Sequence, residues 1–258
     1  MPYRALFLDF DGTTIPNKEK GQPSRRVVTA IKKAAKVLTV CAATSRPLSM
    51  SETIIWRAGF NGPCILNTGA MIYDPTEKKI LKEYVLDPYV IPSVYAIMKK
   101  YCVHVIINDT QKEYVFDGKS IPRRTYNLFT YDIEAQKANE LAGALAGIPG
   151  IAVHKMPAWK KGFMCVEATH PQVSKLHGIV TVAKILGIDT HEMIGVGDGY
   201  NDFPLLMACG LKIAMGNAVP ELKAIADFIA PTVDEDGVAT VIEKFILNGR
   251  STKKEIVT

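Results

Sequence analysis

The chain has 258 residues, of which 48% are apolar and 22% charged, and its formal net charge is +5. The length suits one large domain that carries a second, smaller one, and the composition is that of an ordinary globular protein. No apolar run approaches the roughly 18 residues of a membrane span, residues 4–10 are too short for a secretory leader, and no basic run interleaved with aromatic residues indicates a nucleic-acid partner.

The chain alternates at first between apolar runs and amphipathic stretches. Strands are expected over residues 4–10, 38–43 and 64–66, helices over 24–36 and 49–58, and the start of a hairpin at 71–73. The run at 4–10 is apolar enough for a strand buried on both faces of a parallel sheet. Strands that alternate with helices indicate an α/β sheet with crossover connections.

The pattern changes near residue 78 and reverts near residue 170. The intervening stretch predicts strands at 103–107, 114–116, 151–154 and 162–168 and helices at 91–100 and 135–146, which is typical of an α+β layer with a largely antiparallel sheet. The alternation then resumes, with helices expected at 173–186, 201–208, 220–226 and 237–247 and strands at 193–196, 212–214 and 228–230. The sequence therefore predicts an α/β core made of residues 1–78 and 171–258, split by an inserted α+β domain at 79–170.

The five cysteines are widely spaced and form no CxxC pair; they are Cys41, Cys64, Cys102, Cys165 and Cys209. Most stand beside apolar residues, which predicts buried free thiols in a reducing cytoplasm and argues against a zinc site. The lysines are mostly scattered, as on solvated faces, and the mild positive charge would help to attract an anionic substrate.

Residues 9–13 read DFDGT and follow the first predicted strand directly. Ligands bind beyond the carboxyl ends of parallel strands, and alternate residues of an extended segment can point to one side, so Asp9 and Asp11 can reach one ligand. An EF-hand loop is excluded, because its sixth-position glycine and twelfth-position glutamate are missing. A second copy of the pattern, DEDG at 234–237, opens a predicted helix and is interpreted as a cap, so the pattern alone is weak evidence.

Three further segments carry polar groups at predicted element ends. Residues 40–47 read VCAATSRP, where a hydroxyl suits a phosphate oxygen, although a helix N-cap at Thr44 or Ser45 is the simpler interpretation of that segment alone. Lys175 begins a helix, where a cation is slightly unfavourable, and a solvated lysine is its default interpretation. Residues 193–202 read MIGVGDGYND, which lacks the last glycine and the distant acid of a dinucleotide fingerprint.

These segments converge on one predicted sheet edge, which helix caps alone do not explain. Oxygen ligands without histidine or cysteine suit Mg²⁺, and a cation lets several carboxylates share a small volume with a phosphate. The predicted ligands are Asp9, Asp11, Asp198 and Asp202.

At this point the sequence resembles the haloacid dehalogenase superfamily, and within it the Cof-type (type IIB) phosphatases. The resemblance rests on DFDGT at 9–13, Thr44 within ATSRP, Lys175, GDGYND at 197–202, and the segments 214–218 and 234–239, and it spans nearly the whole chain. It implies a Rossmann-like core with an inserted type IIB cap domain, and a magnesium-dependent phosphatase. Ser45, where the subgroup usually has glycine, Thr68 within NTGA at 67–70, and Thr14 depart from the usual pattern.

The resemblance also implies roles for single residues. Asp9 would attack phosphorus to form an aspartyl-phosphate, and Asp11 would protonate the leaving oxygen and then deprotonate the hydrolytic water. Asp198 would bind Mg²⁺ with Asp9 and the Asp11 carbonyl, and Asp202 would be a further ligand or would orient Lys175. Phosphate binding is expected from Thr44, Ser45, Lys175 and Asn201, and substrate contacts from Arg46, Asn67 and Gly69.

The expected function is hydrolysis of small phosphomonoesters, with sugar phosphates foremost, by a cytoplasmic monomer or homodimer without a nucleic-acid or membrane partner. Inserted-domain residues would choose the substrate, and His154, Lys155 and 159–161 are candidates unless they form only an exposed loop. The alternatives are a phosphosugar mutase of the phosphomannomutase type, a broad-range phosphatase acting on nucleotides or phosphorylated cofactors, and a non-catalytic phosphate- or metal-binding module.

Overall fold

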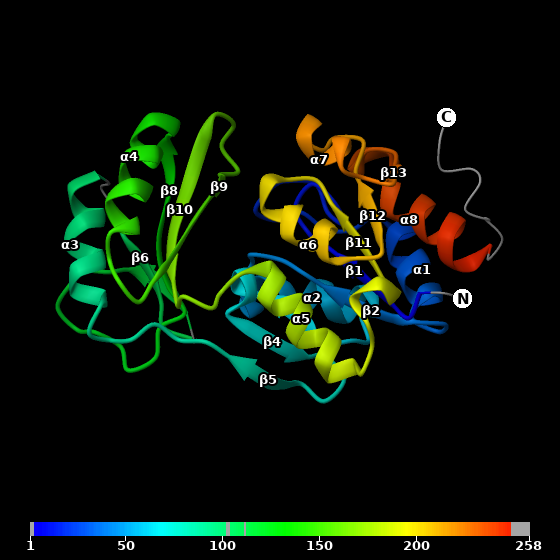
Figure 1. Ribbon diagram of the computed structural model, residues 1–258, viewed down its shortest axis with the longest axis horizontal. Coiled ribbons are helices and arrows are strands. Elements are labelled where there is room, and N and C mark those ends of the chain that lie inside the picture. Colours follow the sequence, from blue (N-terminus) through cyan, green and yellow to red (C-terminus); the bar gives the residue numbers. More distant parts are fainter. Residues whose placement is uncertain (1–2, 102–103, 111, 249–258) are drawn as a thin grey trace. The chain divides into compact units, whose positions relative to one another are not determined.

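The protein is described by a computed structural model that covers residues 3–101, 104–110 and 112–248. Cys102, the first residue of the strand expected at 103–107 and the polar tail lie outside these residues. The chain divides into two compact units, Met1–Lys82 with Ser174–Thr258, and Glu83–Val173 (Figure 1). The first division falls a few residues later than the sequence suggested, because β5 (Lys79–Glu83) pairs with the strand before it and so prolongs a hairpin of the first unit.

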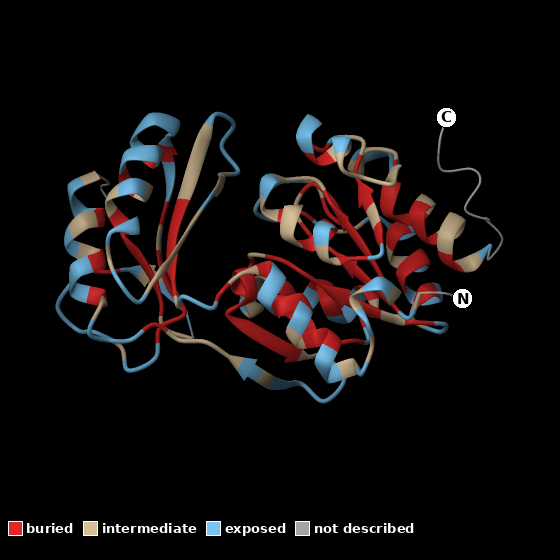
Figure 2. Ribbon diagram, viewed as in Figure 1, coloured by how far each residue is buried: buried red, intermediate tan, exposed pale blue. Residues whose placement is uncertain are grey.

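The first unit contains a five-stranded sheet in the order β13-β12-β11-β1-β2, and every neighbouring pair is parallel. This confirms the α/β fold class expected from the alternation. Its strands are β1 (Ala5–Leu8), β2 (Thr39–Ala42), β11 (Met193–Gly197), β12 (Leu211–Ala214) and β13 (Phe228–Ile229). Every residue of β1 and β11 is buried, as a central parallel strand covered on both faces requires (Figure 2).

The helices of the first unit begin and end where local chemistry places them. Ser24 caps α1 (Arg25–Ala34) by accepting a hydrogen bond from the Val27 amide, and Gly59 ends α2 (Leu48–Ala58) in the left-handed conformation. The remaining α-helices are α5 (Lys175–Leu186), α6 (Phe203–Ala208), α7 (Pro220–Ala224) and α8 (Gly237–Ile242), the last continued by a π-helix at Glu243–Leu247.

A smaller sheet of the first unit joins β3 (Cys64–Leu66), β4 (Met71–Asp74) and β5. The hairpin expected from residue 71 is confirmed. An isolated parallel bridge between Ala43 and Ile65 links the end of β2 to β3, so the loops that follow these two strands lie side by side.

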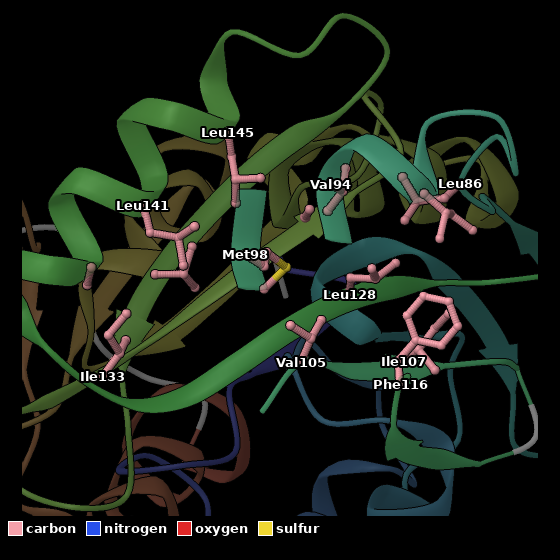
Figure 3. Close-up of a cluster of buried hydrophobic side chains, with 14 residues drawn as sticks. Leu86, Val94, Met98, Val105, Ile107, Phe116, Leu128, Ile133, Leu141 and Leu145 are labelled. Carbon is pink, nitrogen blue, oxygen red and sulfur yellow. The ribbon is translucent and has the colours of Figure 1, made fainter. Parts of the chain in front are cut away.

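The second unit is an antiparallel sheet with two helices, as the sequence predicted. The strand order is β7-β6-β8-β10-β9, formed by β6 (Ile106–Asn108), β7 (Glu113–Val115), β8 (Asn127–Glu134), β9 (Ala152–Pro157) and β10 (Phe163–Thr169). Helices α3 (Ile91–Tyr101) and α4 (Ala135–Ala146) supply Met98 and Leu141 to an apolar core shared with Leu128 (Figure 3). All buried residues of this core belong to the second unit.

The sequence did not reveal β8, although it is the longest strand of the second unit. Its burial does not alternate, and Asp132 has a positive φ of 56° where the pairing with β10 shifts register. A bulge of this kind places two residues opposite one and breaks the period of two that a strand pattern needs. Among the described helices, none is long and apolar enough to cross a membrane.

Candidate active site

The predicted site residues follow three neighbouring strands of the parallel sheet. Asp9 comes directly after β1, Thr44 follows β2, and Asp198 follows β11, and β1 pairs with both of the other strands. Because the strands are parallel, their carboxyl ends meet at one edge. The structure therefore brings together the segments that the sequence placed at separate strand ends.

Lys175 lies at the centre of this edge. Its Nζ is 2.6 Å from Asp9 Oδ1 and 2.6 Å from Asp202 Oδ1, and its side chain is only 1% exposed. Lys175 is the first residue of α5, and Ser174 before it caps the helix by accepting a hydrogen bond from the His177 amide. The default interpretation of Lys175 as a solvated lysine is thus excluded.

Gly69 allows the start of α5 to approach closely. A Cβ at this position would lie 2.4 Å from the Ser174 carbonyl oxygen, and the φ of Gly69 is +109°, so only glycine fits here. Gly69 was predicted as a substrate contact; in the structure a side chain at this position would collide with Ser174, the residue that precedes Lys175. Asn67 and Thr68 beside it also have positive φ values, and Thr68 donates its amide proton to the Thr44 carbonyl.

Asp202 holds Lys175 and the glycine-rich turn together. Its Oδ1 accepts from Lys175, while its Oδ2 accepts from the backbone amides of Asp198 and Gly199 at 2.9 and 3.0 Å. The side chain is fully buried. Both carboxylate oxygens are therefore occupied, and Asp202 is suited to orient the lysine.

Asp198 lies against the turn of the DFDGT segment. Its Oδ1 accepts a hydrogen bond from the Thr13 hydroxyl at 3.0 Å, and a Cβ on Gly12 would lie 2.2 Å from its Oδ2. The Gly12 φ of +79° and this contact together require glycine. Asn217 completes the contact by donating to the Gly12 carbonyl at 2.8 Å and, at 3.5 Å, to Asp198 Oδ2.

Burial and mutual electrostatic interaction shift the pKa values of the charged groups at this edge. Burial is the main reason that the pKa of Asp9 lies well above its ordinary range, and the charges of Asp202 and Asp198 add to the rise against the opposing effect of Lys175. Burial, with the charge of Asp202, raises the pKa of Asp198 from 3.8 to about 7. Burial acts to lower the pKa of Lys175, but the charges of Asp202 and Asp9 outweigh it and raise that pKa.

The carboxylates form a group that fits a hard divalent cation. Oxygen atoms of Asp9, Asp198 and Asp202 all lie within 4.8 Å of one another, and three carboxylates against one ammonium group leave a surplus of negative charge. Oxygen ligands of this kind suit Mg²⁺. Among the described residues, Asp9 accepts from Lys175 through Oδ1 alone, and Asp198 Oδ2 accepts only a long hydrogen bond of 3.5 Å from Asn217. Both oxygens of Asp202, in contrast, accept hydrogen bonds of 3.0 Å or less.

Asp11, the second carboxylate of the segment, points to a different partner. Its two oxygens accept hydrogen bonds from Arg46, from Nε at 2.7 Å and from Nη2 at 2.5 Å. The Asp11 carboxylate is thus not part of the group formed by Asp9, Asp198 and Asp202. Sequence reasoning had placed Arg46 at the substrate and gave no sign of this pair.

The segment after β2 supplies two hydroxyl groups. Thr44 is buried, and its Oγ1 accepts a hydrogen bond from the Arg46 amide at 3.1 Å. The Ser45 hydroxyl is buried without a hydrogen-bond partner among the described residues. Helix α2 begins with Pro47 at its N-cap position and has no side-chain cap, so the helix-cap interpretation of Thr44 and Ser45 is wrong. Asn201 lies in the turn Tyr200–Asp202 and is partly exposed.

Three polar side chains of the site were not expected as such. Thr13 and Asn217 contact Asp198, and the Thr14 hydroxyl donates to the Asp9 carbonyl at 2.5 Å. Thr13 and Asn217 stand in segments that carried the family resemblance, so the signal for them was present. Thr14 had been noted only as a departure from that pattern.

The chain has a Rossmann-like core with an inserted α+β unit, and its acidic group lies at the carboxyl edge of the parallel sheet. A sequence model of the haloacid dehalogenase-like hydrolase family matches residues 6–146 and 119–242. The chain belongs to this family, which confirms the resemblance seen in the sequence.

Known relatives agree with this placement. The chain is 27% identical over 205 residues to a phosphoglycolate phosphatase of Methanopyrus kandleri, covering 79% of this chain and 81% of that protein. It is 46% identical to the Bacillus subtilis protein YkrA over 71 residues, which span only 28% of the length of that relative. The fold is similar to that of BT4131, a subclass IIB sugar phosphatase, with a TM-score of 0.76, 23% identity, and coverage of 94% of this chain and 98% of that one.

Proposed function

We propose that this enzyme is a magnesium-dependent phosphatase that hydrolyses small-molecule phosphomonoesters, sugar phosphates foremost, through an aspartyl-phosphate. The observation that carries the proposal is the buried contact of Lys175 with Asp9 and Asp202, next to Asp198 at the same sheet edge. A phosphatase of this family needs a nucleophile beside fixed positive charge, since phosphoryl transfer depends mainly on positioning and charge neutralisation.

Each reacting group has a candidate in this arrangement. Asp9 attacks phosphorus, the bond to the leaving oxygen breaks, and Asp11 gives that oxygen a proton. Water then attacks the phosphorus of the aspartyl-phosphate, Asp11 takes a proton from the water, and cleavage of the bond to Asp9 releases inorganic phosphate. The two steps consume one water and restore both aspartates.

The remaining residues hold the phosphate and the cation. Lys175 neutralises Asp9 and a phosphoryl oxygen, and Thr44 and Ser45 donate hydroxyl protons; the unpartnered Ser45 hydroxyl supports this role. Asp9, Asp198 and the Asp11 carbonyl would hold Mg²⁺, whose positive charge would let an anionic substrate approach the carboxylates. Asp202 orients Lys175, Asn201 supports the phosphate site, and Asn67 remains the predicted substrate contact.

We assign the choice of substrate to residues of the second unit, because the first unit recognises only the phosphate group. Free cysteines suit a reducing compartment, so we place the enzyme in the cytoplasm; all the cysteines within the described residues are free thiols.

A phosphate-release assay tests this proposal. Purified protein with Mg²⁺ is incubated with sugar phosphates, nucleotides and phosphorylated cofactors, and inorganic phosphate is measured. We expect release from sugar phosphates above the other classes. Turnover that appears only after a sugar bisphosphate is added, without free phosphate, would instead identify a phosphosugar mutase. Strong release from nucleotides or phosphorylated cofactors would indicate a broader phosphatase.

The pKa of Asp198 makes magnesium binding depend on pH. Because this pKa is raised to about 7 in the metal-free protein, Mg²⁺ must displace a proton below pH 7, and its affinity falls there by up to about tenfold per pH unit. The same shift means that Asp198 stabilises the metal-free fold at low pH, and that this contribution is lost as the pH rises through about 7. Mg²⁺ should therefore raise the melting temperature more at pH 8 than at pH 6.

Thermal melts with and without Mg²⁺ across this pH range measure the effect. Glu113 of the second unit also has a raised pKa, but it acts equally with and without the metal and cancels in the difference. Asp198→Asn should reduce the pH dependence of the magnesium shift, and the part that remains belongs to Asp9, whose pKa is also raised. An equal magnesium shift at pH 6 and pH 8 in the unsubstituted protein would contradict the assignment of Asp198 as a ligand.

A further inference from the structure

The guanidinium of Arg46 is held by three residues from two segments of the chain. Its Nε and Nη2 form two hydrogen bonds with the Asp11 carboxylate. The same Nη2 donates to the Lys18 carbonyl at 2.7 Å, and Nη1 donates to the Glu19 carbonyl at 2.8 Å. Arginine presents its donors in a rigid planar fork, so this set of partners fixes both the place and the orientation of the carboxylate.

The backbone of Arg46 is fixed as well. Its amide donates to the Thr44 hydroxyl at 3.1 Å, and its carbonyl accepts from the Asn67 amide at 3.1 Å. The side chain is 4% exposed, whereas that of Asp11 is 25% exposed. The arginine is therefore enclosed by its protein partners, while the carboxylate that it holds keeps an exposed part.

This geometry does not suit a substrate contact. Four hydrogen bonds to Asp11, Lys18 and Glu19 already engage all three guanidinium nitrogens. To reach a phosphate or a sugar, Arg46 would have to abandon a buried ion pair, and a buried charge without its partner is costly. The other alternative is that Arg46 only stabilises the fold. In that case the loss of activity on substituting Arg46 would not depend on the leaving group of the substrate.

We propose that Arg46 is a positioning residue that fixes the Asp11 carboxyl for proton transfer to the leaving group. The inference rests on the proposed function, in which Asp11 donates the proton as the bond between phosphorus and the leaving oxygen breaks. When Asp11 is protonated, one of its oxygens gives up its hydrogen bond from Arg46 and turns its hydroxyl toward the leaving oxygen, while the other oxygen continues to accept from Arg46. The carbonyls of Lys18 and Glu19 hold the opposite side of the guanidinium, so the segment after DFDGT is part of the same support.

A series of leaving groups tests this role. Alkyl phosphates such as glycerol phosphate need a proton on the departing oxygen, whereas p-nitrophenyl phosphate releases a stable phenolate without one. For Arg46→Lys and Arg46→Gln, we expect kcat/KM, which reports the steps up to departure of the leaving group, to fall about 10²-fold for the alkyl phosphate, at the lower end of the usual effect of general acids. For p-nitrophenyl phosphate kcat/KM should fall only a few-fold, whereas kcat can fall on both substrates because Asp11 also deprotonates the hydrolytic water.

The comparison is internal to each variant preparation. Partial unfolding lowers both rates by the same factor, so it cannot imitate selectivity for the leaving group. Arg26→Lys is the matched control, because Arg26 forms an exposed ion pair with Glu243 at 2.8 Å in the same unit and should leave the ratio of the two rates unchanged. An equal loss of kcat/KM on both substrates would overturn the inference.

Asp11→Asn separates this inference from the proposed function. If Asp11→Asn shows the same selectivity for leaving groups, and Arg46→Lys adds little to it in the double variant, the two residues act as one unit. Full additivity in the double variant would refute the positioning role. A selective Asp11→Asn beside an unselective Arg46→Lys would reject only the inference. An Asp11→Asn variant whose kcat/KM falls equally for both substrates would reject the role of Asp11 as the general acid of the proposed function itself.

Discussion

Asp9→Asn is expected to abolish phosphate release, with a fall in kcat of about 10⁴-fold or more, as when a catalytic nucleophile is removed. The amide lacks the negative charge needed to attack phosphorus. Asparagine has nearly the same shape and can still accept from Lys175 through its oxygen, and the Thr14 contact goes to the Asp9 backbone, which is unchanged. The variant should therefore fold, and its melting curve can be compared with that of the unsubstituted protein.

Asp234→Asn is the matched control for this substitution. Asp234 begins the second DxDG pattern, but it is exposed, and its segment is capped by the reciprocal contact between Thr232 and Glu235. We expect its kcat to stay within about twofold, since surface substitutions away from special features have little effect. Phosphate release by Asp9→Asn at a substantial rate would show that the proposed nucleophile is wrong.

The two DxDG patterns show how much a short motif can predict about structure. The first copy of the motif begins at Asp9, directly after a buried strand, and the second copy leads into helix α8, which begins directly after Asp236. Only the neighbouring elements distinguish the two copies. The second copy does lie before a helix, as predicted. Its cap, however, is formed by Glu235 with Thr232, and Asp236 makes no side-chain cap hydrogen bond.

The sequence predicted those parts of the fold that depend on periodicity. Helix α4 matches its predicted range, and β3 does too, because an amphipathic or apolar run leaves a direct trace in the residue order. Strand β8 left no such trace, since its bulge at Asp132 interrupts the alternation. A local pattern cannot reveal a register shift that is set by the neighbouring strand.

The candidate site followed from topology more than from individual residues. Once parallel strands were expected, the segments around Asp9, Thr44 and Asp198 had to meet at one edge. The pairing of Asp11 with Arg46 could not be predicted in this way, because it depends on the rotamer of a long side chain. From the sequence, Arg46 was predicted to contact the substrate. The positioning role is indicated by its four hydrogen bonds in the structure.

Lys175→Met is expected to cause the largest loss of stability. Lys175 is the cation shared by two buried carboxylates, and methionine keeps most of its length but none of its charge. Asp9 and Asp202 are then left without this positive partner, and breaking a buried pair in this way costs about 3–5 kcal/mol of unfolding free energy. The melting temperature should fall by roughly 10 °C, and phosphate release should also be lost, because neither Asp9 nor the phosphate is neutralised.

The pH dependence of this loss identifies its cause. At neutral pH the two carboxylates repel each other or must take up a proton, whereas in mild acid protonation relieves the repulsion, so the destabilisation by Lys175→Met should shrink as the pH falls toward 5. Lys184→Met, an exposed position on the same helix, controls for the substitution itself and should melt close to the unsubstituted protein. If Lys175→Met melts like this control at neutral pH, Lys175 does not compensate the buried carboxylates, and the electrostatic basis for placing the nucleophile at Asp9 fails with it.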